Sequence, residues 1–248
     1  MIEVRKLTKR YGAVLAVNSL SFDIRPGVVT GFLGPNGSGK STTMRMILGL
    51  DAPDGGQALI DGRRYRDLPW PLRECGSLLE ARAFHPGRTA HAHLAALAAS
   101  NGLPRRRVDE VLDIVGLTSA AGRRAGTFSL GMAQRLGLAT ALIGDPAVLL
   151  LDEPTNGLDP AGIHWIRDLI KSLAAEGRAV FVSSHLISEV AKMADYLLVI
   201  GAGQLLADTA VAGIPASEPS LEQWFLDLTQ DSVEYQTSRA GSAREAGA

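Results

Sequence analysis

An eight-residue glycine-rich segment, GPNGSGKS, constrains the fold of this chain more than any other feature of its sequence. It occupies residues 34–41, after the apolar run VVTGFL, which is typical of a buried strand, and before TTMRMILGL, which is typical of a helix. Glycine, four residues, glycine, lysine and serine is the spacing of a phosphate-binding loop, whose backbone N–H groups surround phosphate oxygens at a helix N-terminus. We therefore predict an α/β fold that binds a nucleoside triphosphate.

Two side chains of this loop have the chemistry that nucleotide binding requires. The ammonium group of Lys40 is expected to reach the β- and γ-phosphates, and the hydroxyl of Ser41 is expected to ligate Mg²⁺. The other residues expected to contact the nucleotide are Gly34, Pro35, Asn36, Gly37, Ser38, Gly39 and Thr42. The loop predicts nucleotide binding, but it leaves the class of nucleotide-driven protein open.

Two further apolar runs end in residues suited to nucleotide hydrolysis. Asp152 and Glu153 follow AVLLL, and ligands of α/β sheets bind beyond the carboxyl ends of the strands. Asp152 is predicted to hold Mg²⁺, directly or through water, and Glu153 to polarise the attacking water as a general base. His185 follows AVFVSS and is predicted to contact the γ-phosphate and to keep the water and Glu153 in register. Glu153 and His185 are the candidate catalytic residues.

The remaining sequence indicates one domain over residues 1–228. β-rich runs come first, IEVRKL and LAVNSLSFDI. From about residue 80 to 137 strong helix formers dominate, which predicts a helical subdomain inserted between the phosphate loop and Asp152. The alternation of strands and helices predicts a mostly parallel sheet covered on both faces. Residues 229–248 lose apolar periodicity and are expected to form a disordered tail.

The charge balance excludes one class of partner. Lys and Arg total 25 and Asp and Glu total 26, so the net charge of −1 offers no broad attraction for a polyanion, and we expect no nucleic-acid partner. The basic run at residues 105–107 is expected to begin an exposed helix. A metal site at His85, His91 and His93 is not favoured, because no carboxylate or thiol cluster accompanies these histidines.

The sequence indicates a chain without a membrane span of its own. It has no signal-type segment and no apolar run near the ~20 residues that a spanning helix needs. Its one cysteine, Cys75, rules out an internal disulfide and fits a reducing compartment. We expect a cytoplasmic protein that reaches the cytoplasmic face of the membrane through a partner.

A further set of motifs resembles the ATP-binding subunits of ABC transporters over nearly all of residues 1–228. The matching segments are FSLGMAQR at 128–135 (signature motif), LLLDEP at 149–154 (Walker B strand), NGLD at 156–159 (D-loop) and SSH at 183–185 (switch histidine). Tyr11 stands where this family stacks an aromatic ring on adenine. The resemblance implies a P-loop NTPase fold of ABC type, with a mostly parallel sheet, an N-terminal antiparallel β subdomain and an inserted helical subdomain.

The resemblance also implies an active site shared between two subunits. In this family two subunits meet head to tail, and the signature motif of one covers the γ-phosphate held by the phosphate loop of the other. Ser129 and Gly131 fit that role, because a hydroxyl, a backbone N–H and a helix N-terminus make an anion clamp. Asp159 of the D-loop is also expected at the nucleotide. We expect ATP and Mg²⁺ as cofactors, and a homodimer or a heterodimer with another ATPase.

Two departures from the common family pattern resemble one subgroup. The signature is SLGM where SGGQ is common, so Leu130 and Met132 replace a glycine and a glutamine. Glu80 stands where the Q-loop usually has glutamine; its carboxylate can still face Mg²⁺ but lacks the amide's donor, unless Glu80 is only a surface acid. Both departures resemble ATPases that export bacitracin-type and lantibiotic antimicrobials.

We therefore predict an ATP-hydrolysing subunit that powers export of a drug, an antimicrobial peptide or a lipid-like compound through a separate ABC-2-like membrane permease. One alternative is an importer ATPase, which shares the chemistry and differs in its partner. Another is a soluble ATP-gated clamp that takes no part in transport. Such clamps commonly carry two ATPase domains or a long coiled coil, and this sequence shows neither.

Overall fold

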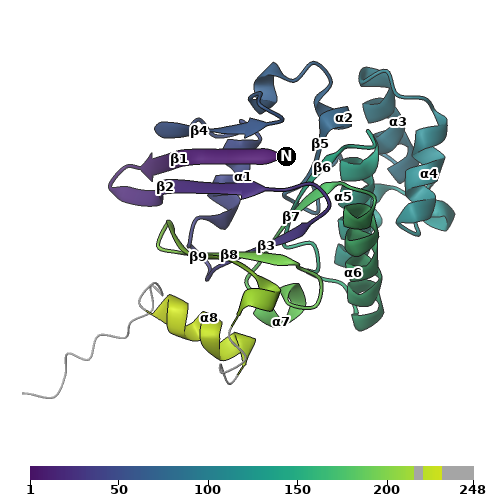
Figure 1. The fold of residues 1–248 in the computed structure, drawn as a ribbon. Coiled ribbons are helices and arrows are strands. Elements are labelled where there is room, and N and C mark those ends of the chain that lie inside the picture. The colour runs from purple at the N-terminus through teal and green to yellow at the C-terminus, as the bar shows by residue number, and fades with distance from the viewer. Residues whose placement is uncertain (215–219, 231–248) are drawn as a thin grey trace, which may run out of the picture.

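The computed structural model describes residues 1–214 and 220–230, and Figure 1 shows how their strands and helices are arranged. Two β-sheets lie face to face, and helices surround the larger one. Thr229, the first residue of the predicted tail, ends a helix. The rest of that prediction lies outside the described residues from residue 231 onward.

A mostly parallel sheet forms the centre of the molecule. Its strands, in spatial order, are β5 (Cys75–Leu78), β6 (Val148–Asp152), β7 (Ala179–Ser184), β3 (Val29–Leu33), β8 (Tyr196–Gly201) and β9 (Gln204–Ala210). Neighbouring strands are parallel from β5 through β8, and β9 pairs antiparallel with β8. Parallel strands need crossover connections, which are usually helical, and these connections cover the sheet. The predicted mostly parallel sheet is confirmed.

Side chains of the central strands alternate between two hydrophobic layers. In β6, Val148 and Leu150 face one layer and Leu149 and Leu151 face the other, and all four are fully buried. A strand that is buried on both faces must be apolar at nearly every position. This double burial is the physical reason for the run VLLL that precedes Asp152.

A smaller antiparallel sheet covers one face of the central sheet. Its strands are β1 (Ile2–Tyr11), β2 (Val14–Ile24) and β4 (Gly55–Ile60), with β1 in the middle. Phe22, Phe32 and Phe181 join the two sheets, with ring centroids 5.0–5.8 Å apart. Helix α1 (Lys40–Ile47) packs in the same hydrophobic layer. The predicted N-terminal antiparallel subdomain is therefore confirmed.

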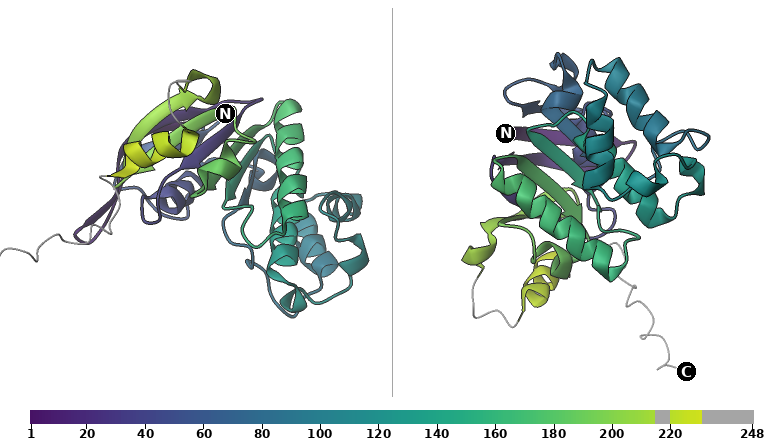
Figure 2. Two further views of the ribbon diagram at one scale, coloured as in Figure 1. Left: turned by 90° about the horizontal axis from the view of Figure 1, so that it is seen from below. Right: turned by 90° about the vertical axis from the view of Figure 1, so that its right-hand side faces the viewer.

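Helices cover the opposite face of the central sheet and extend beyond it (Figures 1 and 2). The longer ones are α3 (Ala90–Ser100), α4 (Arg106–Ile114), α5 (Leu130–Leu142), α6 (Pro160–Ala175) and α8 (Leu221–Thr229). The described residues also form short helices, of which η1 packs through Tyr65 in the layer shared with the N-terminal sheet: η1 (Tyr65–Asp67), α2 (Pro71–Glu74), η2 (Thr118–Ala120), η3 (Ala125–Thr127), α7 (Ile187–Val190) and η4 (Val211–Gly213). None of the helices within residues 1–214 and 220–230 combines the length and hydropathy of a membrane span.

The helical segment predicted at about residues 80–137 contains α3, α4 and the first part of α5, which pack on one another. In Figure 2 (left) α3 and α4 lie away from the N-terminal sheet. The Nε2 atom of His93 in α3 lies 3.1 Å from the hydroxyl of Thr140 in α5. Helix α5 continues to Leu142 and packs against β5, so the helical segment and the central sheet share one hydrophobic layer.

The edge strand β5 is missing from the sequence-based prediction, because CGSL is short and lacks a clear apolar alternation. Hydrogen bonding to β6 forms this strand, which the apolar pattern of the segment does not predict. Cys75 begins this strand and is buried, and burial raises the pKa of its thiol. The thiol therefore stays neutral and packs as a small apolar group.

Candidate active site

The phosphate loop connects the C-terminal end of β3 to the N-terminus of α1. Gly39, at the N-cap of α1, has a left-handed φ of 102°. A Cβ at this position would also lie 2.5 Å from the carbonyl oxygen of Ala16. Glycine is the residue that satisfies both the dihedral angle and the close approach. The backbone N–H groups of the loop therefore lie at the N-terminus of α1, and this arrangement binds phosphate.

A cavity of about 250 Å³ lies over this loop. Its lining consists of Ala16, Asn36, Gly37, Ser38, Gly39, Lys40, Ser41, Thr42 and Glu153. Three buried side-chain oxygens in the described part of the chain have no hydrogen-bond partner, and two of them, Ser38 Oγ and Glu153 Oε2, belong to this lining. Buried polar atoms are normally hydrogen-bonded, so a ligand bound in this cavity would supply the missing hydrogen-bond partners of these two oxygens.

The ammonium group of Lys40 is buried within the loop. Its Nζ atom donates to the carbonyl oxygens of Gly34 at 2.6 Å and of Pro35 at 3.1 Å. Burial lowers the pKa of Lys40, and the negative charges of Glu153 and Asp152 oppose this shift. A desolvated cation in a phosphate-binding loop interacts strongly with an incoming anion.

Asp152 and Glu153 are adjacent in sequence but make different contacts. The hydroxyl of Ser183, on the neighbouring strand β7, donates to Oδ1 of Asp152. The backbone N–H of Glu153 donates to the same hydroxyl oxygen at 3.1 Å. The backbone of Glu153 has a φ of 48°, which is uncommon for a residue other than glycine. At this residue the chain turns away from the strand. This turn gives the two carboxylates different directions.

His185 lies next to Glu153, as its position after β7 predicts. Its Nδ1 atom is 2.9 Å from Oε1 of Glu153. The two residues follow neighbouring parallel strands, β6 and β7, whose carboxyl ends meet at one edge of the sheet. The imidazole therefore holds one oxygen of Glu153 while the other, Oε2, has no partner within the described residues.

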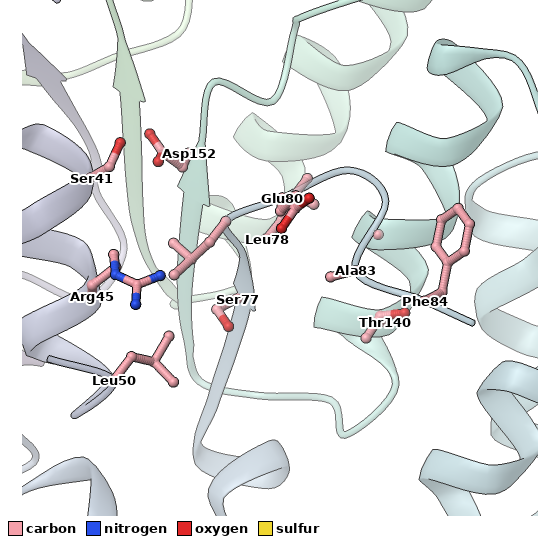
Figure 3. Close-up of a pocket in the computed structure, with 12 residues that line it drawn as sticks. Ser41, Arg45, Leu50, Ser77, Leu78, Glu80, Ala83, Phe84, Thr140 and Asp152 are labelled. Carbon is pink, nitrogen blue, oxygen red and sulfur yellow. The ribbon is translucent and has the colours of Figure 1, made fainter. Parts of the chain in front are cut away.

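The three predicted metal ligands, Ser41, Asp152 and Glu80, line one further cavity of about 540 Å³. In Figure 3 the hydroxyl of Ser41 and the carboxylate of Asp152 face one another. Glu80 lies farther along the same cavity, on the loop that follows β5. The structure thus brings together oxygen donors from the phosphate loop, from β6 and from the predicted Q-loop.

Tyr11 ends strand β1 and is about half exposed (48%). Its hydroxyl donates to Oδ2 of Asp51 at 2.9 Å. The guanidinium group of Arg45 holds the same carboxylate, with Nε 2.8 Å from Oδ2 and Nη2 3.1 Å from Oδ1. This pairing lowers the pKa of Asp51 and keeps it an acceptor for Tyr11. Since Arg45 lies on α1, the network ties the aromatic ring to the helix that begins at the phosphate loop.

The predicted signature and D-loop residues lie outside the lining of the phosphate-loop cavity. Ser129 is exposed and caps α5, its Oγ accepting from the backbone N–H of Met132 at 3.2 Å. Asp159 caps α6 in the same way, with Oδ1 accepting from the N–H of Gly162 at 2.8 Å. Gly131 follows in the first turn of α5. The structure therefore places Ser129, Gly131 and Asp159 at the N-termini of α5 and α6, and none of the three lines the cavity over the chain's own phosphate loop.

Two residues to which the sequence analysis assigned no role hold Asp152 and Glu153 in place. Ser183 bridges Asp152 and Glu153, and the SSH segment already placed it at a strand end. The buried Gln134 of α5 donates from Nε2 to the backbone oxygen of Glu153 at 3.1 Å. The available signal for this contact was the position of Gln134 within the signature segment FSLGMAQR.

Comparison with known proteins agrees with this geometry. Residues 17–156 match the sequence profile of the ABC transporter family. The bacitracin transport ATP-binding protein of Bacillus licheniformis is 44% identical over 84% of this chain and 69% of its own length. The lantibiotic transport ATP-binding protein of Streptococcus pyogenes is 37% identical over 91% of this chain and 96% of its own length.

Solved structures show the same fold. An ATP-binding subunit of an ABC transporter superimposes with a TM-score of 0.83, at 27% identity, over 92% of this chain and 99% of its own. A dimeric ABC transporter cassette in a post-hydrolysis state with ADP and Pi superimposes with a TM-score of 0.79, at 26% identity, over 86% of this chain and all of its own. The chain is therefore an ATP-binding, ATP-hydrolysing protein of the ABC transporter family.

Proposed function

We propose that this chain is the ATPase subunit that powers export of an antimicrobial peptide, a drug or a lipid-like compound through a separate membrane subunit. Support comes from the names of the similar proteins, which describe bacitracin and lantibiotic transport. The departures Leu130 and Glu80 fit the same subgroup. The functional unit in this proposal is the domain over residues 1–228, with its inserted helical segment at about residues 80–137.

The residues at the phosphate loop fit ATP together with Mg²⁺. Ser41, Asp152 and Glu80 offer hydroxyl and carboxylate oxygens along one cavity, and a hard cation prefers oxygen ligands. The Ser183 hydroxyl, which donates to Oδ1 of Asp152, orients this carboxylate. When bound, Mg²⁺ would neutralise charge on the β- and γ-phosphates. Lys40 and the loop N–H groups hold the phosphates, and the ring of Tyr11 stacks on adenine.

One observation carries the proposed hydrolysis mechanism: Glu153 lines the phosphate-loop cavity, and its Oε1 is hydrogen-bonded to His185 while its Oε2 has no partner among the residues that the structure describes. Oε2 accepts a proton from water as the water oxygen attacks the γ-phosphorus. The bond from the γ-phosphorus to the bridging oxygen breaks, and ADP leaves with the electron pair. His185 keeps the carboxylate and the water in line.

The signature residues Ser129 and Gly131 serve the γ-phosphate of a second subunit. The likeness to a dimeric cassette supports a head-to-tail dimer, formed with a second copy or with a related ATPase. The exposed N-terminus of α5 supplies N–H groups and the Ser129 hydroxyl, and Asp159 lies beside it at the start of α6. ATP joins the two subunits, and loss of phosphate weakens the interface and switches the membrane subunit.

The proposed partner is an ABC-2-like permease, which places this chain at the cytoplasmic face of the membrane. The test is co-expression with the membrane protein of about six apolar spans that an adjacent reading frame would encode. We expect co-purification with membranes, ATP turnover, and a stable ATP-bound dimer of Glu153→Gln. Export of a fluorescent peptide antibiotic into inverted vesicles should require ATP and should stop in Glu153→Gln. Association with ribosomes, without membrane association or export, would contradict the proposal.

A further inference from the structure

The side chain of Leu130 occupies the position that a side chain at Gly157 would need. Leu130 is the first residue of α5, and Gly157 lies in the D-loop with a left-handed φ of 74°. A Cβ built on Gly157 would clash with Cγ and Cδ2 of Leu130 and would lie 3.1 Å from its Cβ. The leucine therefore rests directly on the backbone of the glycine.

A second contact on the same turn brings the two backbones together. A Cβ on Gly131 would lie 3.1 Å from the carbonyl oxygen of Gly157 and 3.5 Å from Cδ2 of Leu158. The first turn of α5 and the D-loop are thus in close contact at adjacent positions of the signature, Leu130 and Gly131. Ser129, directly before them, is the residue offered to the partner's nucleotide.

One helical turn later, Gln134 contacts the start of the same loop. Its Nε2 donates to the backbone oxygen of Glu153 at 3.1 Å. Leu130 and Gln134 are four residues apart and therefore lie on one face of α5. That face touches the chain at Glu153 and at Gly157, which bracket the turn between the catalytic carboxylate and the D-loop.

Packing alone does not explain why a leucine lies here. Leu130 is 47% exposed, so it covers little apolar surface compared with a core leucine. Its contact is made to the backbone of a loop that leads to Asp159, the cap of α6. The contact constrains position more than it contributes burial.

We propose that Leu130 is a positioning residue for ATP hydrolysis, which holds the D-loop on the signature turn so that Ser129, Glu153 and Asp159 are presented as one unit. Gly157 is the matching half of this contact, because any side chain there displaces the leucine. The inference rests on the proposed roles of Ser129 and Glu153. A shift of the signature in one half-site is then transmitted to the carboxylate that serves the other.

The experiment is a double-mutant cycle of Leu130→Ala and Gly157→Ala in the full chain, assembled as the ATP-hydrolysing dimer. Gly62→Ala is the matched control for backbone strain, since Gly62 has a φ of 77° and no atom within 4 Å of a built Cβ. Leu226→Ala is the control for loss of a half-exposed leucine, since Leu226 in α8 is 57% exposed. For every variant, kcat, the affinity of the monomer for a fluorescent ATP analogue and the melting temperature are measured.

We expect Gly157→Ala to lower kcat about tenfold or more, since displacements near 1 Å at a reacting centre have effects of that size. Its melting temperature and nucleotide affinity should match those of Gly62→Ala, because the phosphate-loop cavity is untouched. Leu130→Ala/Gly157→Ala should recover to within about threefold of Leu130→Ala, since contacting residues are not additive.

Two results would overturn the inference: a kcat of Gly157→Ala within about twofold of Gly62→Ala, or a double variant whose loss equals the product of the single losses. Ser129→Ala and Glu153→Gln separate this failure from failure of the assigned roles. If both leave kcat unchanged, the roles of Ser129 and Glu153 are wrong. If both abolish turnover while the cycle is additive, only the positioning role of Leu130 is wrong.

Discussion

The Nδ1 atom of His185 lies 2.9 Å from Oε1 of Glu153, although the two residues are 32 positions apart in the chain. Parallel pairing of β6 and β7 brings them together, because Asp152 and Ser183 are paired in register just before them. One carboxylate oxygen is held by the imidazole, and the other, Oε2, is buried and has no hydrogen-bond partner among residues 1–214 and 220–230. This division of the two oxygens is what a general base needs in order to be both oriented and reactive.

Replacing Glu153 by glutamine should lower kcat for ATP by about 10²- to 10⁴-fold, because the base is lost. The affinity for ATP should change little, since the phosphate loop and Lys40 are unaltered. His185→Ala should also lower kcat, and the double variant should be no worse than Glu153→Gln, because the histidine acts through the glutamate. Single-turnover ATPase assays measure both effects. Additive losses would show that His185 has a role independent of Glu153.

Ser183→Ala should weaken the affinity for Mg²⁺ without preventing folding. The hydroxyl of Ser183 donates to the carboxylate of Asp152 and accepts from the backbone N–H of Glu153, so its loss releases the carboxylate of Asp152 and one backbone contact of Glu153. Supporting residues of this kind change metal affinity by about 10- to 100-fold. We expect the Mg²⁺ concentration for half-maximal turnover to rise within that range. Ser172→Ala, in which an exposed helical hydroxyl is removed, is the control and should titrate like the unaltered protein.

Tyr11→Ala should raise KM for ATP by about tenfold, because stacking of a base on an aromatic ring contributes about 1–3 kcal/mol. Tyr11→Phe keeps the ring but loses the hydrogen bond to Asp51, and should raise KM by a smaller factor. Asp51→Asn should resemble Tyr11→Phe. Steady-state kinetics with Mg²⁺-ATP measure these values. An unchanged KM in Tyr11→Ala would show that the ring of Tyr11 does not bind the nucleotide.

The stability of the protein should fall as the pH drops below the unfolded-state pKa of histidine, which is about 6.5. Burial lowers the pKa of His93, with the positive charge of Arg88 adding to the shift. Between the two pKa values the unfolded chain binds a proton at this histidine and the folded chain does not. The contribution of His93 to stability is therefore fully present above the unfolded-state pKa and is lost as the pH falls toward the lower folded-state pKa. We expect a decrease of a few degrees in melting temperature between about pH 7.5 and pH 5.5.

His93→Gln should flatten this pH dependence, because its amide can still donate to the hydroxyl of Thr140 but does not titrate. His91→Gln is the control, since His91 is exposed and its side chain lies 3.9 Å from Asp109 at the surface. Thermal unfolding followed by circular dichroism at both pH values gives the comparison. An equal pH slope in His93→Gln and the unaltered protein would assign the effect to other groups.

Much of the site was predictable because its functional residues lie in short, continuous sequence segments. The phosphate loop requires glycine at fixed positions and a lysine at the helix start, and the structure shows a left-handed Gly39 and a buried Lys40 there. The run VLLL before Asp152 requires burial on both faces and therefore predicts a central strand. By contrast, β5 and Gln134 were missed, because each depends on a partner that is distant in sequence.

The sequence by itself determined the order of the motifs and the nucleotide chemistry, because backbone conformation and apolar periodicity are local properties. The resemblance of those motifs to a known family indicated the fold family. Tertiary structure decided which groups meet: the side chains of His185 and Glu153, the side chains of Ser183 and Asp152, and the side chain of Leu130 with the backbone of Gly157. These contacts depend on strand register and on the seating of α5 against the D-loop. Such placements follow from close packing of the whole domain, which no single segment encodes.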